Sequence, residues 1–523
     1  KNNHETFVNW CKEKKVSPNE YYLVVGRFVP ENNYEIMITE FMKSDTKKDL
    51  VLITNIENNQ FYSDLKRKTG FDNGKYLDMQ SEHIRSRIAQ FGGKLYMEFG
   101  GKLFDDFHAS RVLPGFMPDS KLQMLLKLKE HAEIVIAVSA GAIDSNKRRG
   151  DIGITYDMEV LRLIDLFRSV GLYVGSVVIT QYNGQQSADG FIRRLENLGI
   201  RAYRHYLIEG YPSNIPLIVS ENGYGKNDYV ETSRSLVVVT APGPGSGKMA
   251  VCLSQLYHEH QRGIKAGYAK FETFPIWNIP LKHPVNLAYE AATADLKDVN
   301  MIDPFHLEAY GEIAVNYNRD VEIFPVLQAI FQEIYGTCPY KSPTDMGVNM
   351  AGNCIFDDEA VREASHQEIL RRYYTAMCEQ TKGAEKSDEI SKLKLLMNRE
   401  GLTVENREVA KAARAKEEIT GEPAAAIELP DGTIITGKNQ ELLGAASSML
   451  LNALKHLAGI PDEIHLLAST VIKPVQDLKV NYLGNQNPRL HTDEVLVALS
   501  VSAADDENAR KALACLPMLK DCD

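Results

Sequence analysis

Residues 236–260 read LVVVTAPGPGSGKMAVCLSQLYHEH. The β-branched run Leu236–Val239 is typical of a buried strand. A turn rich in glycine and proline follows, and an amphipathic helix is expected over Met249–His260. A strand, a glycine-rich turn and a helix in this order form the context of a phosphate-binding loop.

The turn between this strand and helix carries the residue types that hold phosphate. Glycines let backbone N–H groups converge on phosphate oxygens, while a helix N-terminus and a lysine supply positive charge. The predicted contacts are Gly243, Gly245, Ser246, Gly247 and Lys248. The alternative is a tight turn with the lysine in solvent.

The turn departs from the G-x-x-x-x-G-K-[ST] pattern at two positions. Pro242 stands at the first glycine, and Met249 replaces the hydroxyl residue that would ligate Mg²⁺. We therefore expect an anionic ligand, foremost a nucleotide such as ATP, with doubtful dependence on magnesium.

Short apolar runs alternate with helix-forming stretches on both sides of this unit. The expected strands are Tyr22–Val25, Val51–Thr54, Lys94–Glu98, Ile134–Val138, Tyr173–Thr180, Leu217–Val219, Leu236–Thr240 and Ile434–Thr436. Helices are expected between several of them, at Lys121–His131, Asp157–Ser169 and Gly190–Leu198. This alternation predicts an α/β fold with parallel sheets and right-handed crossovers.

The length and the changes of pattern predict a multidomain chain. We expect α/β domains over residues 73–232 and 233–400, each with a parallel sheet, and a smaller C-terminal α/β domain over 401–523. The stretch Ala364–Glu418 predicts a long helix or a helical hairpin. A Pro-Asp-Gly turn within Leu429–Gly432 precedes a strand and the helix Ala445–Leu457.

Composition narrows the classes of partner. The 523 residues include 59 Lys and Arg against 70 Asp and Glu, a net charge of −11. This balance argues against nucleic acid or an anionic membrane as partner. The chain has no apolar run near the ~18 residues of a membrane span, and its seven cysteines form no CxxC pair. We expect a soluble cytoplasmic protein; no residue is assigned as a metal ligand, and both the use of a metal and self-association into a homo-oligomer stay open.

Several long segments carry a family resemblance. They include GFDNGKYLDMQSEHIRSRI from Gly70, FGGKLFDDFHASRVLPGF from Phe99, HPVNLAYEAATADL from His283 and VNMIDPFHLEAYG from Val299. From Gly70 to its end, the chain resembles the uncharacterised bacterial family UPF0371, also called DUF1846. The resemblance implies little about function, because that family has no established activity.

The first seventy residues differ in character. The segments YYLVVGRFVPENNYEIMITEFMK from Tyr21 and DLVLITN from Asp49 resemble a fragment of retaining glycosyltransferases with two Rossmann-like domains. We interpret residues 1–72 as a fusion or assembly scar, with an ancestral accessory unit as the alternative. We expect the rest of the chain to fold without it, because one helix between two strands buries little core.

Two polar clusters supply the acid/base candidates. His306 is the leading candidate, with Asp303 or Glu308 to tune it, because its ordinary pKa lies near neutrality. The alternative for Asp303, which precedes a proline, is a helix cap. Glu272 follows the strand that comes after the loop helix, and parallel sheets bind their ligands at this end of their strands. The alternative interpretation of Glu272 is a residue at the protein surface.

Three further turns are candidate contacts. Asn349 lies in the Gly/Asn/Asp-rich segment 342–352, and Gly100 and Gly101 follow a strand where the backbone can approach a ligand closely. Near the C-terminus, Arg489, His491 and Asp493 suit an anion, substrate or metal. Plain turn chemistry explains each of these three segments equally well.

These residues predict binding of a phosphorylated small molecule by an enzyme of the transferase or ATP-dependent ligase class. Lys248 would neutralise phosphate charge, and His306, Asp303 and Glu272 are the catalytic candidates. A non-catalytic nucleotide- or metabolite-binding protein is the alternative that the missing hydroxyl at Met249 favours. Glycosyl transfer is a second alternative, suggested by the N-terminal segment alone.

Overall fold

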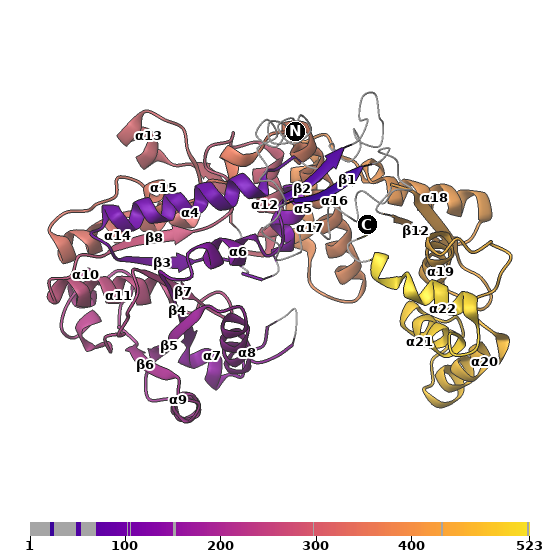
Figure 1. Cartoon of the computed structure of the whole chain (residues 1–523), viewed down its shortest axis with the longest axis horizontal. Helices are drawn as coiled ribbons and strands as arrows, with labels where there is room; N and C mark the ends of the chain where they lie inside the picture. Colours follow the sequence, from indigo (N-terminus) through magenta and orange to yellow (C-terminus); the bar gives the residue numbers. More distant parts are fainter. Residues whose placement is uncertain are drawn as a thin grey trace, which may run out of the picture. The chain divides into compact units, whose positions relative to one another are not determined.

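The structure, a computed structural model, describes residues 21–25, 49–53, 70–101, 103–104, 106–149, 153–296, 298–429, 432–519 and 522. The chain divides into two compact units, Lys1–Leu393 and Lys394–Asp523. Figure 1 labels many of the helices and strands of both units, and each unit is described here by itself.

A seven-stranded sheet forms the centre of the first unit, with the order β11-β8-β3-β7-β4-β5-β6. Every neighbouring pair in it is parallel. The strands are β3 (Leu95–Phe99), β4 (Ala132–Ser139), β5 (Tyr173–Tyr182), β6 (Arg201–Tyr206), β7 (Leu236–Thr240), β8 (Gly267–Phe271) and β11 (Gly347–Val348). The predicted α/β class with parallel strands is confirmed.

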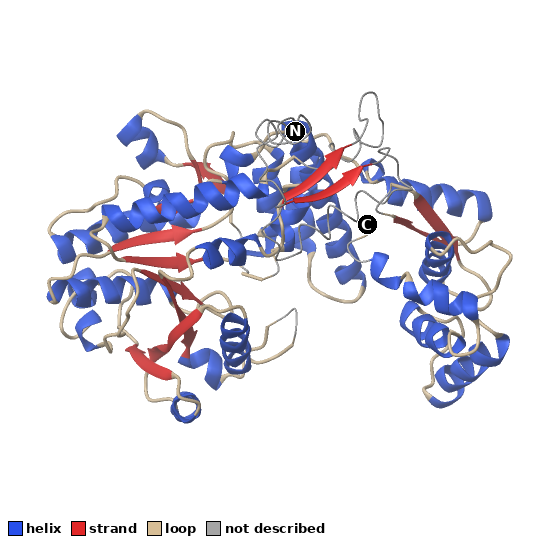
Figure 2. Ribbon diagram, in the orientation of Figure 1, coloured by secondary structure: helices blue, strands red, loops and turns tan. Residues whose placement is uncertain are grey.

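The central strands are buried along their whole length, as parallel strands covered on both faces must be. Figure 2 shows the helices that flank them. These include α4 (Asn73–Gln90), α6 (Ser120–Lys127), α7 (Ala140–Asp144), α8 (Tyr156–Ser169), α9 (Gln186–Asn197), α11 (Lys248–Gln261) and α14 (Asn318–Tyr335). Part of the core lies where Val237 and Val239 of β7 meet Leu253 of α11 and Phe331 of α14.

The strand order creates a switch point at the middle of the sheet. From β3 the chain builds β4, β5 and β6 on one side, and then returns to place β7 between β3 and β4. The next strand, β8, pairs with the other side of β3. The segments that follow β3, β7 and β8 therefore leave one carboxyl edge as neighbours, where open α/β sheets bind their ligands.

Two expectations differ from this sheet. We expected one sheet from residues 73–232 and a second sheet from residues 233–400. The strands of both ranges instead form a single sheet, in which β7 from the second range lies between β3 and β4 from the first. The segment Leu217–Val219, expected as a strand, lies in and directly after the short helix α10 (Ile215–Ile218). Pro216 at the start of that helix suits a first turn and would remove a donor from a sheet.

Smaller elements stand beside the carboxyl edge. Strands β9 (Asn300–Ile302) and β10 (Val315–Tyr317) form an antiparallel pair that leads directly into α14. The helices of this region are α5 (Phe107–Val112), α12 (Pro284–Ala292), α13 (Pro304–Tyr310), α15 (Pro343–Met346) and α16 (Asp358–Thr381). Between them, these elements bring residues far apart in sequence to the ends of β3 and β8.

The second unit is smaller. Its strands β12 (Ala424–Glu428) and β13 (Ile434–Lys438) form an antiparallel hairpin beside α18 (Glu408–Thr420) and α19 (Ala445–Leu457). The remaining helices are α20 (Ser469–Asp477), α21 (Thr492–Ser502) and α22 (Glu507–Ala514). Leu454, Leu490 and Leu499 are buried together in its core. Helix α17 (Ser387–Arg399) spans the boundary between the two units.

Within residues 1–69, the structure describes two strands. β1 (Tyr21–Val25) and β2 (Asp49–Ile53) pair in parallel with each other, in a sheet of their own. The helix that the sequence predicts between them lies outside the described residues. That residues 1–72 are a fusion or assembly scar stays our proposal.

Candidate functional site

Three cavities line the carboxyl edge of the sheet. The loop cavity, of about 440 Å³, lies at the end of β7 and includes Lys248. The central cavity, of about 500 Å³, lies between the ends of β3 and β8. The outer cavity, of about 180 Å³, lies beside β8 and β11. Gly101 lines both the loop and the central cavity, and Glu272 lines both the central and the outer cavity.

The loop between β7 and α11 is held by short-range contacts and two left-handed glycines. Gly245 and Gly247 have φ of 75° and 77°, which residues with side chains rarely adopt. The hydroxyl of Thr180, at the end of β5, donates to the carbonyl of Ser246 at 2.8 Å. The Ser246 hydroxyl in turn donates to the carbonyl of Gly243 at 2.9 Å. The loop is therefore fixed from inside, with its helix N-terminus beside the cavity.

Lys248 is the first residue of α11 and lines the loop cavity. The residue is half-buried, and its ammonium makes no hydrogen bond or ion pair with any residue that the structure describes. The 14-residue helix adds partial positive charge at the same point. An unpaired ammonium at such a position favours an anion from solution.

Two arginines share the loop cavity with Lys248. Arg149 and Arg162 both line it, and both form ion pairs with Glu159, which is fully buried. Together with Lys248, they place three cationic side chains on the wall of this cavity, and such side chains suit the recognition of phosphate.

A tyrosine from α8 completes the loop cavity. A Cβ placed on Gly243 would lie 2.3 Å from the Tyr156 hydroxyl oxygen, so the absence of a side chain at Gly243 admits this ring. Met249, next in the loop helix, is partly buried against the hydrophobic core. It offers no hydroxyl oxygen to a metal ion.

A cluster of charged side chains stands at the end of β8. Both carboxylate oxygens of Asp320 lie 2.6 Å from the Lys270 ammonium, which also contacts the Tyr317 hydroxyl. Glu272 Oε1 lies 3.1 Å from the same ammonium and accepts a hydrogen bond from the Tyr317 hydroxyl at 2.9 Å. Lys270 and Asp320 are each about 9% exposed at the side chain, whereas Glu272 is 26% exposed and faces two cavities.

The cluster consists of the ion pair between Lys270 and Asp320 and of the titratable carboxyl group of Glu272. Burial alone would lower the pKa of Lys270, but Asp320 and Glu272 raise it well above its ordinary value. Burial raises the pKa of Glu272 from 4.5 to about 7, and Asp320 and Glu98 add to this against the opposing charge of Lys270. A carboxyl group that titrates near neutrality at a cavity wall suits general acid/base chemistry.

His306 and Asn349 line the outer cavity together with Glu272. His306 is 8% exposed, and its Nδ1 lies 3.0 Å from the Ser342 hydroxyl. The Asn349 amide donates to the carbonyl of Thr273 at 2.8 Å, and its oxygen accepts the Ala351 N–H. Asn349 therefore joins the loop after β8 to the loop after β11.

Asp303 stabilises the local fold and does not line any of the three cavities. It is fully buried, and one carboxylate oxygen accepts the N–H groups of Phe305 and His306, so it caps α13. The other oxygen accepts the hydroxyl of Thr344 at 2.6 Å. Without exposure and with both oxygens engaged, Asp303 cannot touch a ligand in this structure. It holds the backbone of His306 in place.

Gly100 and Gly101 lie at the end of β3, where Gly100 lines the central cavity and Gly101 lines both the loop cavity and the central cavity. The Gly100 N–H donates to the carbonyl of Phe271 at 3.0 Å, and a Cβ on Gly100 would meet Glu272 Cγ at 3.1 Å. Gly101 has φ of 73° and lines the two neighbouring cavities. Gly100 thus permits the end of β3 to approach Glu272.

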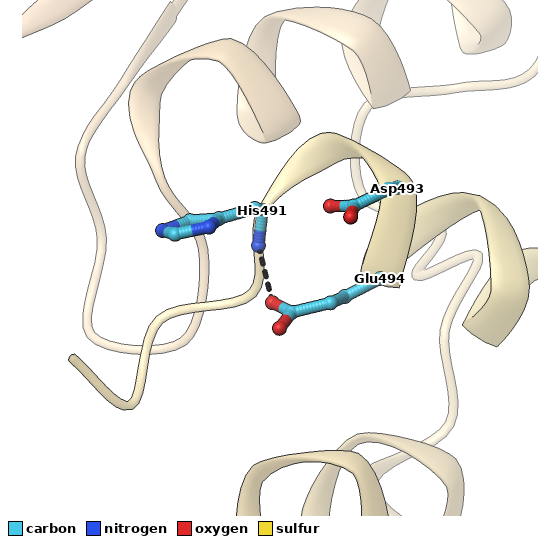
Figure 3. Close-up of side chains that lie close together, drawn as sticks. All are labelled: His491, Asp493 and Glu494. Carbon is cyan, nitrogen blue, oxygen red and sulfur yellow. Dashed lines mark hydrogen bonds between the residues drawn. The ribbon is translucent and has the colours of Figure 1, made fainter. Parts of the chain in front are cut away.

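The C-terminal polar cluster lies in the second unit. Figure 3 shows His491, Asp493 and Glu494 at the start of α21, with the His491 N–H donating to Glu494 at 2.8 Å. Lys479 also donates to Glu494 at 2.8 Å. These contacts form a helix cap, and the lysine already supplies the positive charge that a metal ion would bring. The Arg489 guanidinium donates to the carbonyl of Gln440.

The structure thus places the sequence candidates in two neighbouring groups. Glu272, His306 and Asn349 share the outer cavity, while Lys248 lies in the loop cavity, with the central cavity adjoining both through Glu272 and Gly101. The candidates chosen from sequence did not include Arg149, Tyr156, Arg162, Lys270 and Asp320. Tyr156 and Arg162 come from α8, Asp320 comes from α14 and Lys270 lies in β8, and no local motif in the sequence marks them as neighbours of the candidates.

Within the described part of the chain, no helix combines the length and the apolar character that crossing a bilayer requires.

Comparison with known proteins identifies the family. The model for the domain of unknown function DUF1846, N-terminal, matches residues 69–401, and that for DUF1846, C-terminal, matches residues 405–523. A UPF0371 protein of Corynebacterium urealyticum is 59% identical over 455 residues, covering 87% of this chain and 92% of the relative. UPF0371 proteins of Streptococcus thermophilus and Streptococcus pneumoniae strain JJA are each 58% identical, with the same coverage. The chain therefore belongs to the uncharacterised DUF1846 family, whose bacterial members are called UPF0371 proteins.

Proposed function

We propose that this protein is an enzyme that binds a phosphorylated small molecule, foremost a nucleotide, in the loop cavity. The observation that carries the proposal is the half-buried Lys248 at the N-terminus of α11, whose ammonium has no partner among the residues that the structure describes. The left-handed glycines Gly245 and Gly247 support it, because such a loop turns backbone N–H groups toward an anion. The cationic side chains of Arg149 and Arg162 on the wall of the same cavity support it further.

The proposed reaction class is group transfer or ligation, with Glu272 as general acid/base. Both reactions need a proton moved at a nucleophile or a leaving group beside the phosphate. The Glu272 carboxyl has a pKa of about 7, is partly exposed, and accepts a hydrogen bond from Tyr317 that fixes its orientation. His306 lines the same outer cavity and is the second acid/base candidate.

A non-catalytic nucleotide- or metabolite-binding protein is the competing proposal. Met249 favours it, because this side chain packs against the core where a magnesium ligand would stand in a nucleotide hydrolase. The two proposals share the loop cavity and differ in the role of Glu272.

Replacing Lys248 by alanine should weaken binding of a phosphorylated ligand by about 2 kcal/mol, or roughly 30-fold, because a charged hydrogen bond is lost. A thermal-shift panel of nucleoside triphosphates, nucleotide sugars, sugar phosphates and pyrophosphate would select the probe. A probe at 100 times its Kd adds ~2.7 kcal/mol of stability. Titration calorimetry would then compare the variant with the parent protein.

The matched control is Lys129→Ala, which removes an exposed lysine that precedes β4 at the opposite edge of the sheet. It should bind the probe as the parent does. Equal affinity of the Lys248 variant and the parent, or a panel in which no phosphorylated compound shifts the melting temperature, would exclude the loop as a phosphate site.

Binding of the same probe should depend little on magnesium. Met249 offers no hydroxyl oxygen to the ion, and Lys248 supplies a positive charge beside the phosphate without it. Calorimetric titrations in 5 mM Mg²⁺ and in excess EDTA should give dissociation constants within about threefold of each other, less than 1 kcal/mol. If EDTA abolishes binding, a carboxylate such as Glu272 must hold a metal, and the metal-free account is wrong.

A further inference from the structure

The outer cavity is lined by polar side chains from several elements that lie far apart in the sequence. They come from α4, β8, α13, β10, α14 and α15. At about 180 Å³ it is the smallest of the three cavities. Sites for drug-sized ligands measure roughly 300–1,000 Å³, so this cavity takes a smaller molecule or one part of a larger one.

Lys270 and Arg87, which line this cavity, contact protein groups of their own. The Lys270 ammonium lies 2.6 Å from both carboxylate oxygens of Asp320. The Arg87 guanidinium donates to the carbonyl of Asp345. An anion would have to displace these contacts, and it would lie beside the carboxylates of Asp320 and Glu272, where like charges repel. The cavity therefore favours an uncharged ligand over a phosphate or a carboxylate.

Two histidines of the cavity keep ring nitrogens that no described residue uses. His306 contacts the Ser342 hydroxyl through Nδ1, while its Nε2 has no hydrogen-bond partner among the residues that the structure describes, although the residue is only 8% exposed. His83, on α4, makes no hydrogen bond or ion pair within the described part of the chain. Burial and the nearby Arg87 lower the pKa of His83, so its ring is neutral at pH 7. A neutral imidazole carries one donor and one acceptor, and buried polar atoms are rarely left without a partner.

A carboxylate oxygen and an indole ring stand on the same walls. Oε1 of Glu272 contacts Lys270 and Tyr317, whereas its Oε2 has no hydrogen-bond partner among the described residues. This oxygen requires a donor from the ligand, because an ionised carboxylate only accepts hydrogen bonds. The Trp277 indole lines the cavity and is held by its N–H, which donates to the carbonyl of Asn349 at 2.8 Å. Its ring adds apolar surface to these polar groups.

We propose that the outer cavity binds a small uncharged compound with several hydroxyl groups, such as a monosaccharide or a cyclic polyol. A hydroxyl both donates and accepts, so such a compound can donate to Glu272 and exchange hydrogen bonds with His306 and His83. An ammonium ion would suit Glu272 but offers no acceptor to an imidazole N–H. The apolar C–H groups of the ring would lie against Trp277. The proposal goes beyond the phosphate site and does not depend on it, because Lys248 does not line the outer cavity.

Titration of Trp277 fluorescence tests this proposal in the full-length Trp10→Phe variant, where Trp277 is the sole tryptophan. The probes are glucose, galactose, mannose and myo-inositol. At least one of them should change the fluorescence along a saturable curve. Cyclohexanol keeps a ring of the same size with a single hydroxyl, and it should bind at least about tenfold more weakly, because a site that pairs with hydroxyl groups rejects an analogue that lacks them.

Replacing His83 by phenylalanine should weaken binding of the best probe about tenfold, because the ring keeps its size and loses both nitrogens. His83 has no hydrogen bond to lose within the described part of the chain, so the substitution leaves the fold intact. The matched control is His131→Phe, at an exposed position directly before β4 that lines none of the three cavities. This variant should bind the probe as the parent does.

Three outcomes would each overturn the proposal: no binding of any of the four probes by fluorescence or calorimetry, equal binding of cyclohexanol and the best probe, or equal affinities of the His83 and His131 variants. The variant Lys248→Ala separates this result from the phosphate site, because it should bind the sugar or polyol as the parent does.

A second arm distinguishes two sources of the hydroxyl groups. If they belong to the phosphorylated ligand itself, the His83 variant should also bind the phosphorylated probe from the thermal-shift panel more weakly, because one molecule then reaches both cavities. If they belong to a separate substrate, the affinity of that probe should be the same in the His83 variant and the parent. Either result supports a polyhydroxyl compound in the outer cavity, because both require the His83 variant to lose affinity for the free sugar or polyol.

Discussion

Replacing Lys270 by methionine should lower the free energy of unfolding of the first unit by about 3–5 kcal/mol. Methionine keeps most of the length and the apolar stem of lysine but removes the ammonium. Asp320, at 2.6 Å, and Glu272, at 3.1 Å, would then face each other in a buried site without a cation. Breaking a buried ion pair from one side is costly because the remaining charge stays desolvated.

Urea unfolding followed by Trp277 fluorescence measures this effect. Trp277 lines the outer cavity with Lys270, and a Trp10→Phe background makes it the sole tryptophan. The double variant Lys270→Met, Asp320→Asn should recover part of the loss, because the orphaned carboxylate is gone. The control Lys129→Met, at an exposed position, should change stability by less than about 0.5 kcal/mol. A loss below 1 kcal/mol for Lys270→Met would mean that the pair contributes no more than a surface ion pair.

The local parts of the fold were predictable from sequence. The strand expected at Leu236–Thr240 is found at those residues, and the helix expected at Ala445–Leu457 is found without a shift at either end. Both depend on patterns within a few residues: a β-branched run before a glycine-rich turn, and small apolar residues after a glycine. Such signals need no knowledge of distant partners.

The order of the strands in the sheet and the charged cluster at the end of β8 could not be predicted from the sequence. β7 enters between β3 and β4, although more than 90 residues separate it from each, so adjacent segments do not reveal the single sheet. Lys270 and Asp320 are 50 residues apart, and only the parallel sheet and the β9–β10 pair bring them together. Contacts of this kind are decided by packing of whole elements, not by local composition.

Asp303 and Glu272 illustrate two outcomes for acidic candidates. Asp303 precedes Pro304, and this local signature of a helix cap is what the structure contains. Glu272 has no such local explanation, and it stands at the carboxyl end of a central strand. The position of a carboxylate relative to its strand was therefore a better guide to the cavities than the density of polar residues around it.

Replacing Glu272 by glutamine should make the protein more stable at pH 8 than the parent, and this advantage should shrink as the pH falls to 5. The pKa of Glu272 is about 7 in the folded chain against an ordinary value of 4.5. Below pH 4.5 the carboxyl is protonated in both folded and unfolded chains, so burial costs nothing. As the pH rises toward 7, the unfolded chain releases the proton first, and stability is lost until the folded chain has also ionised.

The expected change in the stability difference between pH 5 and pH 8 is about 2–3 kcal/mol, since each pKa unit is worth about 1.4 kcal/mol. Glutamine keeps the oxygen that accepts the Tyr317 hydroxyl, so the substitution removes the charge and preserves the hydrogen bond. Urea unfolding followed by Trp277 fluorescence, measured at pH steps from 5 to 8, gives the difference directly.

Glu82→Gln, at an exposed position of α4, is the matched control and should show a constant difference from the parent across this range. If the free energies of unfolding of the Glu272 variant and the parent also differ by a constant amount across this pH range, Glu272 is already ionised at pH 5. Lys270 would then hold it as a permanent carboxylate, and the proton-transfer role would pass to His306, its neighbour in the outer cavity.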